Sequence, residues 1–442
     1  MNDTTLQHIR HEIYACFERA GDALFNVVDA LVSESQAQSL PEWSLSPFFE
    51  RKWPSVSEAL EDGRITVEQL RTVLIKTLVG QREDNEPIWR ALDASNIERP
   101  DAKTSADRGM IHLSNLPLVD KPIGVGWMFS SVVLLPASPS SWTPILDQRR
   151  ISTEETPIQV AIAQLRALRP LFGSRQVIVM ADRGYCTPAF LRTCRELGYS
   201  VLVRLKSDRK LYRPGVRIHK RGPTPKDGPL FQGKRKETHA EPEAICQAQD
   251  SKGRSVRISR WGDLHFKQDR DLVLKVTCVE RETAKGTKRD PRVSWFVTFD
   301  DAIPLSQTPG LYALRFSQEH HYRFLKQNLL WTCVHVRTPE QFERWSWLIA
   351  IAFDLLYLAR ELAQVLHRPW EPKDRPVTPQ QVRRVMPAIL LHLGTPTQLC
   401  QPRGKSPGRA KGFRPQPAQR FQVIRKHPKE PKKPKEPLQP TG

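Results

Sequence analysis

Apolar residues recur at intervals of three or four over residues 1–85, which predicts a helical region. Leu6, Ile9 and Ile13 belong to a first periodic segment, and Leu70 and Leu74 belong to a second one. An Asp-Gly pair at positions 62 and 63 lies between the two segments and predicts a turn. The pattern alone does not decide whether this region packs on the rest of the chain or contacts a ligand.

Residues 86–205 alternate between strand-like and helical patterns, which predicts an α/β architecture. Asp93 ends the first apolar run and Asp182 ends a later one. An aspartate after a strand is most often a turn residue, but α/β sheets also present ligand-binding groups at the carboxyl ends of parallel strands. The predicted strands cover 88–93, 124–136 as one strand or two adjoining ones, 176–181 and 201–205, with helices at 156–168 and 187–197.

The second half of the chain changes character three times. Residues 206–300 alternate basic loops with runs of β-branched and aromatic residues, which predicts a β-rich insertion. Helices are expected at 311–330, from Thr338 to about 359, and around 378–393. Residues 402–442 are mostly Pro, Lys, Arg and Gly, which predicts a disordered cationic tail.

Positive charge is concentrated in two of these regions. The 442 residues include 68 basic and 48 acidic ones, a net charge of +20. Residues 206–292 hold 23 basic and 12 acidic side chains, and residues 402–442 hold 12 and 2. Basic regions on an otherwise balanced chain indicate a polyanionic partner such as nucleic acid.

The helix expected at 311–330 has one charged face. Placed at about 100° per residue, five side chains fall on that face, and leucines occupy the other. Such a face is usually only solvated surface. One carboxylate among three cations and a tyrosine, however, suits a metal ion beside a polyanion better than a ladder of ion pairs. The five residues are Tyr312, Arg315, Glu319, Arg323 and Lys326.

The spacing of four of these residues resembles the Tyr-Arg-Glu-Lys signature of cut-and-paste bacterial insertion-sequence transposases. Two residues separate Tyr312 from Arg315, three separate Arg315 from Glu319, and six separate Glu319 from Lys326. These transposases belong to the DDE family, named for three catalytic carboxylates. Phe316 and Gln318 differ from the commoner residues of that pattern, but neither is one of the four signature residues.

The resemblance implies a ribonuclease H-like mixed-sheet catalytic core in which Asp93, Asp182 and Glu319 are catalytic and hold metal. Carboxylates that converge need a cation between them, and two Mg²⁺ ions are expected, with Mn²⁺ able to substitute. Tyr312, Arg315, Arg323 and Lys326 would bind DNA. Trp295, on the last strand of the β-rich insertion, would stack on a base, although an ordinary core tryptophan is the alternative.

The same resemblance implies the division of the chain and its partners. The partners would be transposon ends and target DNA, bound by a homodimer in a synaptic complex, in the bacterial cytoplasm at the nucleoid. The expected parts are residues 1–85, a helical region that binds transposon ends or packs on the core; 86–205, the first part of the core; 206–300, the insertion; 301–400, the glutamate helix and C-terminal helices; and 401–442, the disordered tail.

Two other classes of function share some of these features. A non-catalytic DNA-binding protein derived from a transposase would keep the fold but lose a carboxylate. A ribonuclease H-fold nuclease would share the carboxylates but would not need Tyr312, Arg315 and Lys326. The sequence keeps all of these residues, which favours the transposase.

No feature of the sequence indicates a membrane or an oxidising compartment. The most apolar run, residues 345–359, is 15 residues long and contains Asp354, so it is too short and too polar to span a bilayer. The N-terminus lacks the pattern of a signal peptide. The seven cysteines form no C-x-x-C pair, which favours reduced thiols and no structural metal.

Overall fold

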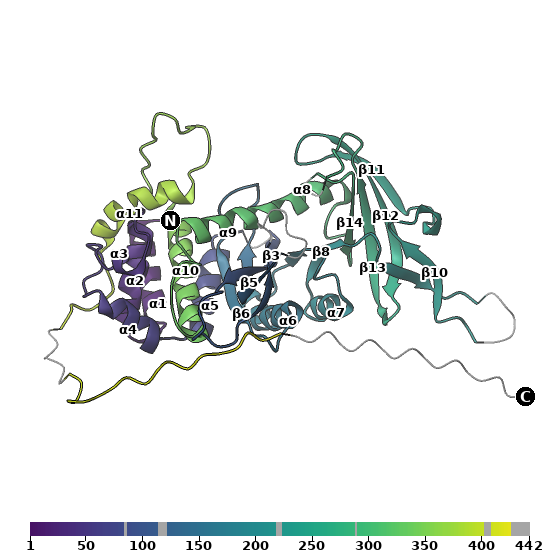
Figure 1. Cartoon of the computed structure of the whole chain (residues 1–442). Coiled ribbons are helices and arrows are strands. Elements are labelled where there is room, and N and C mark those ends of the chain that lie inside the picture. The colour runs from purple at the N-terminus through teal and green to yellow at the C-terminus, as the bar shows by residue number, and fades with distance from the viewer. Residues whose placement is uncertain (84–85, 114–121, 218–222, 288–289, 402–407, 426–442) are drawn as a thin grey trace, which may run out of the picture.

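The computed structural model describes residues 1–83, 86–113, 122–217, 223–287, 290–401 and 408–425 (Figure 1). Within these residues twelve strands form one mixed sheet, and helices lie on both of its faces. A set of N-terminal helices packs at one end, and the β-rich insertion extends from the other end.

Five strands form the centre of the sheet, in the order β6-β5-β3-β7-β8. Strand β5 runs antiparallel to both of its neighbours, β6 and β3, and β7 and β8 run parallel to β3. This order and these directions are those of a ribonuclease H-like core, so the predicted fold class is confirmed. The bounds are β3 Ile88–Glu98, β5 Ile123–Leu134, β6 Ile145–Ile151, β7 Val177–Ala181 and β8 Ser200–Leu205.

The first core strand is longer than the sequence predicted. A strand ending at Asp93 was expected, but β3 continues to Glu98. The reason is tertiary: β5 is one long strand that pairs with β3 from Arg90 to Glu98. Ala94 therefore continues the strand rather than beginning a turn. The short strand β4 (Gly109–His112) pairs with the beginning of β5 and forms an edge of the sheet.

Two helices below the sheet in Figure 1 begin where the sequence predicted. Thr156 and Thr187 each accept a hydrogen bond from a backbone N–H of the first turn, and a proline follows each of them. These local caps stop the chain from continuing as a strand. The helices are α6 (Pro157–Leu168), followed by a 3₁₀ turn at Arg169–Phe172, and α7 (Pro188–Glu196).

The N-terminal region is helical and packs on the C-terminal helices. Every residue of α2 from Ala23 to Ser33 is buried. Arg10 and Asp29 form a buried ion pair at 2.7 Å. The region therefore packs on the C-terminal helices, and its contact with DNA stays a prediction. The elements are α1 Asp3–Tyr14, β1 Phe17–Arg19, α2 Gly21–Ser33, α3 Leu40–Trp43, α4 Pro54–Asp62, β2 Arg64–Ile65 and α5 Val67–Val79, which pack with α10 Pro339–Ala359 and α11 Pro379–Leu393.

The predicted β-rich insertion is present, and it continues the core sheet. Its last strand, β14, pairs antiparallel with β8, with Trp295 opposite Leu205. The strands are β9 Lys210–Pro214, β10 Asp227–Gln232, β11 Ala244–Gln249, β12 Ser255–Phe266, β13 Asp269–Glu280 and β14 Val293–Thr298, with short 3₁₀ turns at Lys236–Thr238 and Leu305–Gln307.

The segment expected as a single helix at 311–330 is broken. Helix α8 (Thr308–Ala313) gives way to a 3₁₀ turn at Leu314–Phe316, and α9 covers Ser317–Gln327. Ser140 donates a backbone hydrogen bond of 3.3 Å to the hydroxyl of Ser317, the first residue of α9. The charged residues therefore do not share one straight helical face, because Tyr312 and Glu319 lie on different sides of the break.

Part of the expected disordered tail is attached to the core. Phe421 and Ile424 donate backbone hydrogen bonds to Lys103 and Arg108, each 2.8 Å long. The expectation of disorder is wrong for this stretch because a composition that cannot form its own core can still pair with a sheet edge. Residues 402–407 and 426–442 lie outside the described residues. Among the described helices, none is both long and apolar enough to cross a membrane.

Candidate functional site

Asp93 and Asp182 are neighbours across a pair of parallel strands. Ala91 of β3 lies opposite Met180 of β7, so two residues further along both chains reach an aspartate. Adjacent strands are separated by about 4.8 Å. Both carboxyl groups are partly exposed, and Gly184 donates its backbone N–H to Asp182 Oδ1 at 2.7 Å. The structure therefore brings these two predicted site residues together.

Glu319 joins the two aspartates from the first turn of α9, where its side chain is exposed. The pKa of Asp93 is raised above its ordinary value, chiefly by burial, and the negative charges of Asp182 and Glu319 raise it further. Arg315 opposes this shift. Asp182, Glu319 and Arg315 are thus all close enough to Asp93 to change its pKa by their charges.

Arg315 is the cation of the site. Its Nη2 lies 2.9 Å from Asp93 Oδ2, and its side chain is only 12% exposed. Burial lowers the pKa of the guanidinium, but the charges of Asp93, Tyr312, Asp182 and Glu319 outweigh burial and raise it. The guanidinium therefore stays charged although it is mostly buried. Ion pairs are stronger in such a position than at a solvent-exposed surface.

Helix α9 is held on β3 by two further hydrogen bonds. Tyr322 donates its hydroxyl to the backbone oxygen of Asp93 at 3.0 Å. Lys326 donates its ammonium to the backbone oxygen of Asn96 at 3.2 Å. Burial lowers the pKa of Lys326. The helix that supplies Glu319 is thereby fixed to the strand that supplies Asp93.

The other predicted DNA-binding residues lie in different settings. Arg323 is exposed on α9. Tyr312 is only 7% exposed and packs on Phe296 with ring centroids 4.7 Å apart. Burial raises the pKa of Tyr312. Arg323 therefore faces solvent, whereas Tyr312 is a packed residue beside the site.

Trp295 lies inside the insertion, away from its surface. Its side chain is 6% exposed and contacts the rings of Phe231, His239 and Trp261, with centroids 5.4–5.9 Å away. A Cβ at Gly233 would come within 2.7 Å of the indole, so glycine allows the backbone to lie on it. In this structure the side chain occupies the core position that was the alternative to base stacking. Stacking would require it to leave this cluster, and it stays a prediction.

Sequence reasoning missed two tyrosines at the carboxylates. Tyr185 is 4% exposed and follows Asp182 by three residues; burial and the charges of Asp93 and Asp182 raise its pKa well above the ordinary value. Tyr322 follows Glu319 by three residues, a spacing that places side chains on one helical face. That spacing was a usable signal for Tyr322, whereas nothing local marked Tyr185.

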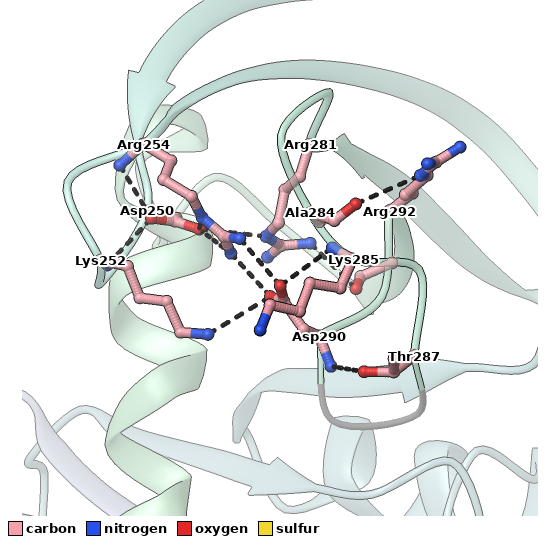
Figure 2. A network of polar contacts seen from close by, with 10 residues as sticks. Asp250, Lys252, Arg254, Arg281, Ala284, Lys285, Thr287, Asp290 and Arg292 are labelled. Atoms are coloured by element: carbon pink, nitrogen blue, oxygen red, sulfur yellow. Dashed lines mark hydrogen bonds and ion pairs between the residues drawn. The ribbon is translucent and has the colours of Figure 1, made fainter.

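A network of charges lies within the insertion, between two of its loops (Figure 2). Arg254 contacts Asp250 at 2.7 Å and Asp290 at 2.9 Å, and Arg281 lies 3.5 Å from Asp250. Hydrogen bonds from Arg254 lower the pKa of Asp290. The network joins the loop after β11 to the loop after β13. A cavity of about 100 Å³ separates these loops from Tyr312.

The three carboxylates are the type of ligand that binds a divalent cation, but in this structure they do not surround a common point. Asp and Glu oxygens are the ligands that Mg²⁺ prefers. Within the part of the chain that the structure describes, no three Asp, Glu, His or Cys side chains are close enough to hold one ion. Asp93 instead uses one oxygen for Arg315 and the other for the N–H of Ala94. A metal ion on Asp93 Oδ2 would therefore compete with the ion pair to Arg315.

The ribonuclease H-like core has Asp93 on β3, Asp182 directly after the neighbouring strand β7, and Glu319 on the later helix α9. The model of the family described as DDE superfamily endonuclease matches residues 12–265, more than half of the chain. This protein therefore belongs to that family. The matched region includes Asp93 and Asp182 and ends before Glu319.

Two solved structures are similar to the chain at low identity. One is a cryo-EM structure of a piggyBac transposase synaptic complex with hairpin DNA, with 9% identity, a TM-score of 0.44, and coverage of 93% of this chain and 87% of that one. The other is a Mos1 transposase paired-end complex with left transposon end, with 17% identity, a TM-score of 0.17, and coverage of 39% and 56%. No curated protein shows significant sequence similarity to the chain.

Proposed function

We propose that this protein is a cut-and-paste DNA transposase that binds the terminal inverted repeats of a bacterial insertion sequence, excises the element and joins it to target DNA. The observation that supports the proposal is that Asp93, near the middle of β3, pairs with Arg315 and lies close enough to Asp182 and Glu319 for their charges to raise its pKa. A nuclease or a DNA-binding protein of this fold would not require that combination.

Asp93, Asp182 and Glu319 are the residues that would hold Mg²⁺, or Mn²⁺ in its place. Two such ions would supply an activated water or 3′-hydroxyl and stabilise the leaving oxygen. The chain's own contribution is to keep Asp93 in place: Tyr322 holds its backbone oxygen, and β5 pairs with its strand. Burial and the negative charges of Asp182 and Glu319 disfavour the ionised form of Asp93. A bound cation would offset this repulsion.

The cations of the site would hold the DNA backbone. Arg315 carries a planar guanidinium that can exchange the Asp93 carboxylate for a phosphate, since both offer paired oxygens. Lys326 and the exposed Arg323 would bind phosphates further along α9. A DNA contact of the mostly buried Tyr312 would use its hydroxyl. These groups position DNA and carry no information about its sequence. A homodimer holding two ends in a synaptic complex, in the bacterial cytoplasm, completes the proposal.

The test is DNA cleavage by variants that keep the shape of each carboxylate. Asp93→Asn, Asp182→Asn and Glu319→Gln should each abolish Mg²⁺-dependent cleavage of duplexes that carry the inverted repeats flanking the coding sequence, and each should still bind DNA. Asp271→Asn, an exposed carboxylate on β13, is the matched control and should cleave normally.

The outcomes separate the three classes of function. Full cleavage by any one of the three variants removes that residue from the site. Cleavage by the wild type without joining to target DNA would identify a nuclease. Binding without cleavage at any divalent ion concentration would identify a DNA-binding protein.

A further inference from the structure

The β-rich insertion contains a cationic cleft at the end where it joins the core. The cleft has a volume of about 490 Å³ and lies between the loop that joins β8 to β9 and the turn that joins β12 to β13. Among the described residues, four cations and one carboxylate contribute to its lining. We call it the basic cleft and define it by Lys206, Asp208, Arg209, Lys210, Phe266 and Lys267.

The lysines of the basic cleft are not neutralised by the described part of the chain. Lys206, Lys210 and Lys267 are exposed, and their ammonium groups form no ion pair or hydrogen bond with described residues. The network of Figure 2 differs in this respect, because there two aspartates bind the guanidinium of Arg254. Like charges gathered along the walls of a cleft raise the local potential and attract ions of opposite charge. The basic cleft is therefore suited to a ligand with several negative charges.

Three contacts fix the two sides of the basic cleft. Arg209 donates Nη2 to the backbone oxygen of Cys186 at 3.1 Å, and its Cζ lies 5.8 Å from the centroid of the Phe266 ring. Arg192 of α7 forms an ion pair with Asp269, the residue that ends the turn between β12 and β13. Both sides are thus attached to the segment that follows β7. A cleft that is already fixed loses little conformational entropy when a ligand binds.

The basic cleft lies at the same edge of the sheet as the candidate site. Strand β8 runs parallel to β7, so both strands end at one edge. Asp182 follows β7 directly, and Lys206 follows β8 directly. Cys186, which accepts the hydrogen bond of Arg209, is four residues from Asp182, and four residues span at most about 14 Å. Base pairs are stacked about 3.4 Å apart, so the basic cleft is within about five base pairs of Asp182.

Building on the proposed action on DNA, we propose that the basic cleft binds backbone phosphates of duplex DNA within about five base pairs of the phosphodiester that is cut. Duplex DNA carries one negative charge per about 1.7 Å of its axis, so neighbouring phosphates reach cations on both sides of the cleft. Lysine ammonium groups bind phosphate as point charges and read no base, so this contact is independent of DNA sequence. The basic cleft is a second phosphate site, separate from the cations of α9.

The first experiment measures binding of the full-length protein to a duplex of about 30 base pairs that carries the inverted repeat, without divalent ions so that no cleavage occurs. Lys206→Gln/Lys267→Gln removes one cation from each side of the cleft. Each phosphate contact contributes roughly 0.9 to the slope of log affinity against log salt, so the slope should flatten by up to about 1.8. At about 0.15 M salt the same slope corresponds to a loss of affinity of up to about thirtyfold. Both lysines are exposed, so the melting temperature should not change.

The second experiment locates the contact with duplexes in which one phosphate is replaced by an uncharged methylphosphonate. For the wild type, the replacement should weaken binding about fivefold at one or more positions within about five base pairs of the cut. For Lys206→Gln/Lys267→Gln it should have almost no effect at those positions, because the contact is already lost. Arg257→Gln is the matched control. It removes an exposed cation near the other end of β12, up to about 30 Å from Phe266, and should keep the wild-type pattern.

The outcomes separate the basic cleft from the proposed function. Equal affinity and equal salt slope of the wild type and Lys206→Gln/Lys267→Gln overturn the cleft as a DNA site, even if cleavage is normal. Methylphosphonates that weaken binding of both proteins equally at every position also overturn it. A wild type that shows the predicted pattern but never cleaves DNA refutes the proposed function, while the cleft stands. A wild type that binds no DNA refutes both.

Discussion

Arg315 and Asp93 are 222 residues apart in sequence and form an ion pair of 2.9 Å in the centre of the candidate site. The pair joins the segment before α9 to the middle of β3. It also places one positive charge where two other carboxylates repel Asp93. The proposed site thus contains its own counter-charge.

This pair predicts a shift in the pH dependence of cleavage. The pKa of Asp93 is raised, and Arg315 is the group that limits the rise. Arg315→Gln should raise the pKa further, so Asp93 will be protonated at higher pH, and the acid limb of the cleavage rate should move to higher pH. Arg323→Gln removes an exposed cation from α9 and should leave the acid limb where it is. An unmoved limb in Arg315→Gln would mean that Asp93 does not ionise in the rate-determining step.

Tyr322 should contribute to both stability and cleavage. Tyr322→Phe removes only the hydroxyl that donates to the backbone oxygen of Asp93. One such hydrogen bond contributes about 1 kcal/mol to the free energy of unfolding. We expect a loss of that size in urea unfolding and slower cleavage with DNA affinity unchanged. Wild-type cleavage rates in the variant would show that Asp93 is held without this bond.

Asp354 predicts a pH dependence of stability that is independent of function. It is buried in α10, where Oδ1 accepts the N–H of Ile145 at 2.8 Å and Oδ2 has no partner among the described residues. Burial raises its pKa well above the ordinary 3.8. The native state therefore binds this proton more tightly than the unfolded state, so stability is lost as pH rises above about 4.

An asparagine at position 354 would keep the acceptor without a charge. Asp354→Asn should raise the free energy of unfolding at neutral pH by about 1–3 kcal/mol. It should make little difference near pH 3, where both side chains are neutral. Thermal unfolding of the two proteins across pH 3–8 measures this, and parallel curves would contradict it.

The basic tail predicts the salt dependence of DNA binding. Each phosphate neutralised contributes roughly 0.9 to the slope of log affinity against log salt. Truncation after Arg425 removes five lysines but keeps the backbone hydrogen bonds of Phe421 and Ile424 to the core, so the slope should flatten by at most about four and a half units, with melting temperature unchanged. Truncation after Gln401 should flatten the slope further and also lower the melting temperature, because β4 loses its neighbour. Identical melting temperatures of the two truncations would contradict a stabilising role for the hydrogen bonds of Phe421 and Ile424.

Trp295 requires a substitution that respects its burial. Trp295→Ala would remove a core side chain, which costs about 3–5 kcal/mol. Trp295→Phe keeps an aromatic ring in the cluster of Phe231, His239 and Trp261. If the tryptophan leaves the cluster to stack on an unpaired base, this variant should nick the first strand normally but accumulate nicked ends and form few hairpins. Hairpins at the wild-type level would leave Trp295 a core residue only.

The sequence by itself determined the local elements and the order of the carboxylates. Thr156, Thr187 and Thr338 mark helix starts because a threonine side chain caps N–H groups only three residues away. Runs of alternating and periodic residues predicted the core strands, since periodicity is a property of neighbouring positions. The placement of Asp182 after β7 followed from the same local signals.

Only the tertiary structure decided which distant groups meet. It continued β3 past Asp93 because β5 pairs with the whole strand, and it broke the glutamate segment at Leu314–Phe316. It also placed Arg315 on Asp93 and paired Ile424 with Gly109 of β4. The last two contacts join residues more than 200 positions apart, and the energies of all of them depend on burial and alignment in the folded chain. Local pattern contains neither quantity, so sequence could name the carboxylates but could not show what surrounds them.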